Sequence, residues 1–212
     1  MKLFSLSMQS MKAFKALLLL GLLFSFGCQS SLSPSEYVKW VSDSENGLRR
    51  VKQIGSVKME LQYKPIPYVI ANELRSNHID RTAFEERYTA LEGGQYFTMK
   101  ISIDEPGQDI TKYGIRDMNE QQERLYYLSY AMQNDIHLLQ GSDTLACKLY
   151  HFERSYDLTP HRTFVLAFDE KESPDLNDKT FIWDTPLFGT GPIKVKFRSE
   201  SLEEIPNMKI DG

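Results

Sequence analysis

Strict alternation of apolar and polar residues is the feature of this sequence that most limits its fold. Between Gln95 and Asp104, Phe97, Met99 and Ile101 alternate with polar neighbours. Successive side chains of a β-strand point to opposite faces, so this spacing predicts a strand with one buried and one wet face. Val57 to Tyr63 repeats the pattern. Such half-buried strands are typical of an antiparallel sheet covered on one side.

The second half of the chain continues with short, closely spaced strands. We expect strands over 51–63, 95–104, 136–139, 145–153, 162–168, 179–183 and 193–198. Gly141-Ser142-Asp143 predicts a hairpin turn, and 162–168 is expected to pair with 179–183 across the acidic segment 169–178. The sequence therefore predicts an α+β fold: a single domain with a twisted antiparallel sheet of about six or seven strands, and with helices inserted in its first half.

Helical spacing is confined to the part of the chain before residue 135. The expected helices cover 37–41, 68–75, 80–91 and 118–134. Asp80 is a plausible N-cap, and Asp117 with Glu120 has the spacing of a capping box. In the longest helix an apolar stripe is expected to face the core: Met118, Leu125, Leu128 and Met132.

The N-terminal segment has the pattern of an export signal. Its only charges are Lys2, Lys12 and Lys15, followed by an apolar run over 16–26. A membrane-spanning helix needs about 20 apolar residues, and this run is shorter. A basic flank, a short apolar core and small residues at its end indicate a cleaved signal peptide. Met11 is an alternative start, and a noncleaved anchor or buried helix is the alternative interpretation.

The end of this segment, Ser25-Phe26-Gly27-Cys28, resembles the lipobox of bacterial lipoproteins. Gly27 and Cys28 match its strict positions, whereas Ser25 and Phe26 form a relaxed version like those of Bacteroidetes envelope lipoproteins. The resemblance implies a signal peptide over 1–27, cleavage between Gly27 and Cys28, and a diacylglyceryl group on Cys28. Residues 28–35 would then be a lipidated tether, and 36–212 a single globular domain. Gln29 implies the outer membrane, and the lack of an acidic cluster directly after Cys28 implies a position facing the periplasm.

Charge and cysteine content agree with attachment through lipid. The chain has a net charge of −4 although its first 28 residues carry three lysines and no acid, so the remainder is more acidic still. Anionic headgroups would repel such a body, and no basic stripe suggests nucleic acid. Cys147, the only other cysteine, is expected to be a small buried hydrophobe.

Signatures of catalysis are missing from the sequence. It contains no Gly-x-Ser-x-Gly elbow, phosphate loop, Gly-x-Gly-x-x-Gly or His-Glu-x-x-His motif. We therefore expect no catalytic residue, metal or cofactor, and we interpret the acidic segment 169–178 as a solvated loop. An enzyme whose residues are dispersed along the chain, such as an envelope hydrolase, stays open as an alternative.

Exposed aromatic residues are the remaining candidates for a binding site. Tyr126, Tyr127 and Tyr130 exceed what a narrow buried stripe needs, and Phe188 lies in a loop rich in glycine. We expect these four as a partner surface, with core packing as the alternative. The resulting interpretation is a membrane-anchored, non-enzymatic binding or assembly module whose partner is an envelope protein. A carrier or receptor for an apolar ligand, such as lipid or acyl chains, is the alternative.

Replacement of Cys28 by alanine tests the anchor. The Cys28→Ala variant should incorporate no labelled palmitate, because the thioether needs the thiol. Metabolic labelling of the full chain measures this, with Cys147→Ala as the matched control that keeps its label. A labelled Cys28→Ala protein would contradict the lipoprotein interpretation.

Overall fold

The computed structural model describes residues 31–153, 159, 161–170 and 177–212. The chain divides into two units, Met1–Ser31 and Leu32–Gly212, and the second is described below. Gly27, Cys28 and the expected signal peptide lie outside the described residues, as does most of the acidic segment 169–178.

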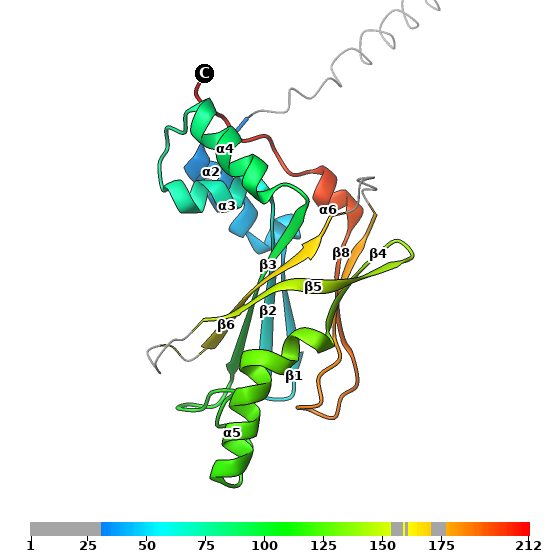
Figure 1. Cartoon of the computed structure of the whole chain (residues 1–212). Helices are drawn as coiled ribbons and strands as arrows, with labels where there is room; N and C mark the ends of the chain where they lie inside the picture. The colour runs from blue at the N-terminus through cyan, green and yellow to red at the C-terminus, as the bar shows by residue number, and fades with distance from the viewer. Residues whose placement is uncertain (1–30, 154–158, 160, 171–176) are drawn as a thin grey trace, which may run out of the picture. The chain divides into compact units, whose positions relative to one another are not determined.

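Eight strands form one sheet, and most helices precede its second half (Figure 1). The strands are β1 Arg49–Ile54, β2 Val57–Lys64, β3 Gly94–Ile103, β4 Ile136–Gln140, β5 Asp143–Phe152, β6 His161–Asp169, β7 Lys179–Trp183 and β8 Ile193–Phe197. The helices are α2 Pro34–Ser42, η2 Ser44–Asn46, α3 Ile66–Leu74, α4 Arg81–Leu91, α5 Met118–Tyr126, η3 Tyr127–Ala131, η4 Met132–Asp135 and α6 Ser199–Glu203. The α+β class is confirmed.

The expected strand count was wrong, because residues 51–63 form a hairpin and not one strand. β1 and β2 pair in antiparallel fashion from Ile54 opposite Val57 outward. Gly55 and Ser56 make the two-residue turn, and Gly55 has a φ of 56°. A glycine adopts this left-handed backbone without steric cost, which permits the tight turn. The sheet therefore has eight strands in the order β1-β2-β3-β6-β5-β4-β7-β8.

The expected pairing of 162–168 with 179–183 was also wrong. β6 lies between β3 and β5, and β7 lies between β4 and β8, all in antiparallel pairs. Alternation of apolar residues fixes which face of a strand is buried, but it does not select the neighbouring strand. Both segments form strands in the structure, with partners different from those expected.

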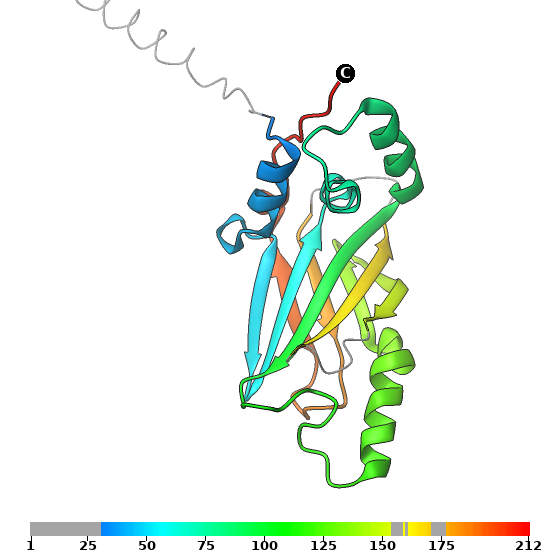
Figure 2. The ribbon, with the colours of Figure 1, turned by 90° about the vertical axis from the view of Figure 1, so that its left-hand side faces the viewer.

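Aromatic rings fill the space between the two halves of the sheet. The ring of Phe97 on β3 lies 5.2 Å from that of Tyr63, 5.6 Å from Phe168, 6.3 Å from Phe181 and 5.7 Å from Phe197. β7 and β8 stand at the far end of the strand order, so these contacts require the sheet to roll over on itself. Figure 2 shows the orange strands β7 and β8 behind the cyan and green strands β1–β3.

A second apolar cluster covers one end of the rolled sheet. Tyr37 and Val41 on α2 pack with Tyr68 on α3 and with Leu202 and Met208 near the C-terminus. Leu32 forms a parallel bridge with Met208, and α2 begins at Pro34. The folded unit thus begins at Leu32, four residues before the start that was expected at Glu36.

Truncation of Phe97 tests the ring cluster. Phe97→Ala should lower the free energy of unfolding by about 3–5 kcal/mol, because it leaves a cavity among four rings. Urea unfolding of the full chain measures this. Phe84→Ala on α4, which removes a half-buried ring outside that cluster, is the matched control and should cost clearly less. Equal losses in the two variants would contradict a central role for Phe97.

Candidate functional site

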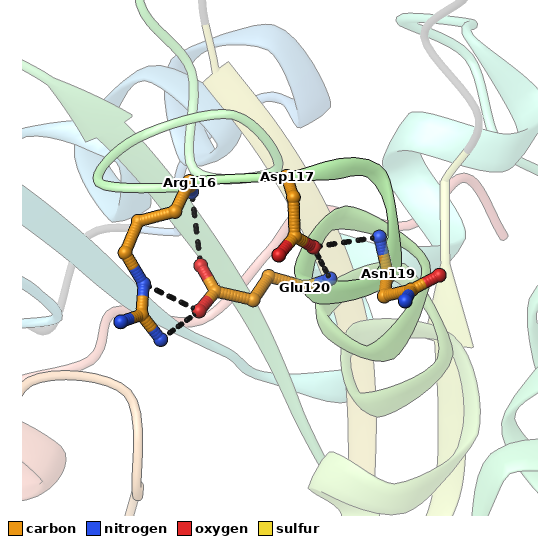
Figure 3. Close-up of polar contacts among 4 residues, drawn as sticks. All are labelled: Arg116, Asp117, Asn119 and Glu120. Carbon is orange, nitrogen blue, oxygen red and sulfur yellow. Dashed lines mark hydrogen bonds and ion pairs between the residues drawn. The ribbon is translucent and has the colours of Figure 1, made fainter.

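Helix α5 begins at a cap that the sequence indicates only in part. The Asp117 carboxylate accepts hydrogen bonds from the backbone N–H groups of Asn119 at 2.9 Å and Glu120 at 3.0 Å, as a helix N-cap does (Figure 3). The Glu120 carboxylate does not return to Asp117. It accepts from the backbone N–H of Arg116 at 2.9 Å and from the Arg116 guanidinium. The cap is confirmed, and the reciprocal half of the capping box is displaced by one residue.

The loop that precedes α5 is tied to the sheet by a buried ion pair. Asp109 accepts from Arg162 on β6 at 2.7 Å and from the backbone N–H of Thr111 at 2.7 Å. Burial alone would raise the pKa of Asp109, but the bonds from Thr111 and Arg162 hold it below its usual value. Arg124 on α5 donates to the Ile110 carbonyl at 2.9 Å. These bonds fix the position of α5 relative to the sheet.

Three of the most exposed large apolar side chains of the described residues lie on α5 and η3. Met118 is 67% exposed, Tyr126 65% and Tyr130 66%, and Leu125 beside them is 47% exposed. The expected core stripe was therefore half wrong, since only Leu128 and Met132 are buried. In both ribbon views α5 runs beyond the end of the strands, so its first turns have no sheet to cover (Figure 1, Figure 2).

A change in helix geometry follows Tyr126, within the segment that carries both exposed and buried apolar residues. α5 ends at Tyr126, and η3 is a π-helix, whose turn is wider than that of an α-helix. Leu128 points into the core, while the rings of Tyr126 and Tyr130 lie 5.6 Å apart on the surface. Met118, Leu125, Tyr126 and Tyr130 are called the α5 face below.

The four residues expected as a partner surface are thus divided between two environments. Tyr126 and Tyr130 are exposed, whereas Tyr127 and Phe188 are half-buried. The Trp183 indole N–H donates to the Tyr127 hydroxyl at 3.3 Å, and burial raises the pKa of Tyr127 to about 12. The ring of Phe188 lies edge-on to Trp183 at 5.8 Å. Tyr127 and Phe188 therefore lie against Trp183 at the edge of the core, and they are not part of the exposed α5 face.

A second feature, which the sequence did not reveal, lies between the two edge strands of the sheet. A groove of about 530 Å³ separates β1 from β8. Its walls are formed by the following residues: Glu45, Gly47, Arg50, Val51, Lys52, Lys194, Val195, Lys196, Arg198 and Ser201. No signal in the sequence places β1 beside β8, although the Gly55-Ser56 pair marks the turn between β1 and β2. The term edge groove denotes this site below.

Burial shifts the pKa of Cys147 and of Lys179 in the interior. Burial raises the pKa of the Cys147 thiol to about 11, so it stays protonated at neutral pH, as expected of a buried hydrophobe. The buried ammonium of Lys179 donates to the Gln95 side chain and lies 5.7 Å from the centre of the Tyr63 ring. Burial lowers the pKa of Lys179. Within the described ranges, no three His, Cys, Asp or Glu side chains gather as a metal site.

Comparisons with family models, with curated proteins and with solved structures find no match to this chain. Among the residues that the structure describes, no helix combines the length and apolar character needed to cross a membrane.

Acidification tests the bond between Asp109 and Arg162. A carboxyl whose pKa is depressed by folding stabilises the protein above its unfolded pKa, and this contribution is lost as the pH falls through the lower folded value. Asp109→Asn should therefore cost about 1–3 kcal/mol at neutral pH and less at acidic pH. Chemical unfolding across pH measures both. Glu120→Gln, in an exposed pair with Arg116, is the control and should change stability much less. A pH-independent loss in Asp109→Asn would contradict this role.

Proposed function

We propose that this protein is a lipid-anchored envelope lipoprotein that acts as a non-enzymatic binding or assembly module, and that an envelope protein docks on its α5 face. The observation that carries the proposal is the pair of neighbouring rings of Tyr126 and Tyr130, each about two-thirds exposed, with the exposed Met118 about two turns before them on the same helical segment. Scattered single apolar residues are normal on a protein surface, whereas a contiguous group marks an interaction site.

The chemistry of the α5 face suits a protein partner. Tyrosine offers a large apolar ring together with a polar hydroxyl, and it is enriched at protein interfaces. Its side chain has few rotatable bonds, so little conformational entropy is lost on binding. The face is also held in place from below, since Arg124 and the ion pair of Asp109 with Arg162 fix α5. A surface that is already ordered loses less conformational entropy on binding, so it binds its partner more tightly.

The packed interior favours a surface partner over an enclosed apolar ligand. The rings around Phe97 meet at centroid distances from 5.2 to 6.3 Å, which are contact distances. An acyl chain in this position would have to displace them. The carrier alternative therefore draws less support than the binding module.

The lipid on Cys28 would place the module at a membrane. Gln29 favours the outer membrane, and the lack of an acidic cluster directly after Cys28 favours its periplasmic side. Only residues 29–31 separate Cys28 from the folded unit. At about 3.5 Å per residue they span roughly 10 Å when fully extended. In both ribbon views α5 lies at the end of the folded unit opposite Leu32 (Figure 1, Figure 2), so the α5 face would meet its partner on the side away from the attachment point.

Site-specific crosslinking tests the proposal. A photo-crosslinking residue at the exposed Gln122, one turn from Tyr126 on α5, should give one discrete adduct with an envelope protein in intact membranes. Tyr126→Ser and Tyr130→Ser should each weaken binding of that partner about tenfold, as expected for buried interface tyrosines. Tyr88→Ser on α4, an exposed tyrosine outside the face, is the matched control. Equal yields in all three variants would overturn the proposal, as would an adduct formed equally from Glu85 on α4.

A further inference from the structure

The edge groove concentrates positive charge on a protein that is acidic overall. Five cationic side chains line it, Arg50, Lys52, Lys194, Lys196 and Arg198, against a single acid, Glu45. The whole chain carries a net charge of −4. A solvated acidic surface does not need such a cluster, and its concentration in one hollow points to an anionic ligand.

The β1 wall of the groove carries cations on the side of the sheet that faces the core. Arg50 stands opposite Leu61 of β2, and Lys52 stands opposite Met59. Residues directly opposite in an antiparallel pair point to the same face, and Leu61 and Met59 are fully buried. Arg50 and Lys52 thus project inward from the edge strand. Hydrogen bonding between β1 and β8 would bury both charges, which explains why the two strands stay apart.

The β8 wall adds cations from the opposite direction. Lys194 and Lys196 are exposed, and they alternate with the buried Val195. Lys196 forms an ion pair with Asp178, which leaves Lys194 and Lys52 without an acidic partner among the described residues. Lys194 and Lys196 thus project from the outer face of β8, whereas Arg50 and Lys52 project from the inner face of β1, and both pairs border the edge groove.

Arg50 keeps one unsatisfied donor in the wall of the groove. Its Nε is buried and has no hydrogen-bond partner within the described part of the chain. A buried guanidinium nitrogen without a partner costs free energy that an anion could recover. A Cβ placed on Gly47 would lie 2.3 Å from the Ser201 hydroxyl and 3.3 Å from Nη2 of Arg50. Gly47 and Ser201 thus close one end of the groove beside the Arg50 guanidinium.

We propose that the edge groove is a binding site for a compact, multiply charged phosphate group. The planar guanidinium of Arg50 offers two parallel donors to phosphate oxygens, and the lysines add point charges. The volume of about 530 Å³ falls in the range of small-ligand sites. Gly47 and Ser201 close one end of the groove, so a compact anion could lie there against the Arg50 guanidinium. This site is separate from the α5 face and does not depend on it.

Calorimetric titration tests the proposal, with the full chain in a neutral detergent and inorganic tripolyphosphate as the probe. Lys52→Gln/Lys194→Gln should weaken binding about tenfold, because two exposed cations that attract the anion are lost. Lys39→Gln/Lys58→Gln removes the same charge from exposed positions outside the groove and is the matched control. Arg50→Lys keeps the charge but removes the paired donors, and it should also weaken binding. Unchanged thermal unfolding shows that each variant is folded.

The source of the phosphate is distinguished by a second titration with detergent micelles that contain phosphatidic acid. Groove-dependent binding of tripolyphosphate alone supports a soluble phosphate ligand, and groove-dependent binding of the micelles supports a lipid headgroup. Absence of both would overturn the proposal, and so would equal weakening in Lys52→Gln/Lys194→Gln and Lys39→Gln/Lys58→Gln. Tighter binding of polyglutamate than of tripolyphosphate would also overturn it, in favour of an acidic peptide.

Discussion

Phe97 contacts rings from β2, β6, β7 and β8, and the rest of the structure depends on this packing. A flat sheet of eight strands could not bring β3 against β8. Burial of the rings drives the sheet to roll until its two ends face each other. The roll places β1 and β8 on either side of the edge groove, and it leaves the rim at Trp183 free to support η3 and the α5 face.

The rolled sheet does not close fully, because charged side chains keep its end strands β1 and β8 from pairing. Strands that face the core carry apolar residues inward, but Arg50 and Lys52 occupy the inward positions of β1. Hydrogen bonding between β1 and β8 would require these charges to lose their water without a compensating partner. Two sheet edges therefore stay unpaired, and the cations between them protect those edges from pairing with other chains. The same charges make the groove suitable for an anion.

Much of the sheet could be predicted from the sequence, because alternation fixes the buried face of each strand. The strands near residues 97, 138, 147 and 195 lie where expected. The β1–β2 hairpin was missed, since its only mark is the pair Gly55-Ser56 within an apparently continuous strand. The order of the strands depends on contacts between segments that are distant in the sequence. The exposure of Met118 depends on where the sheet ends beneath α5, which the sequence of the helix does not indicate. The edge groove was not predictable, because its two walls are about 140 residues apart in the sequence.

The folded unit combines an exposed apolar helix face with an open, basic seam between β1 and β8, and we propose a lipid anchor at Cys28. β1 and β8 are unpaired edges across that seam, and residue-resolved hydrogen exchange tests this directly. Every second backbone amide of β1 and β8 should be protected by β2 or β7, while the alternate amides, which point into the groove, should exchange rapidly. Strong protection of both sets would mean that the seam is closed by hydrogen bonds, and it would contradict the account.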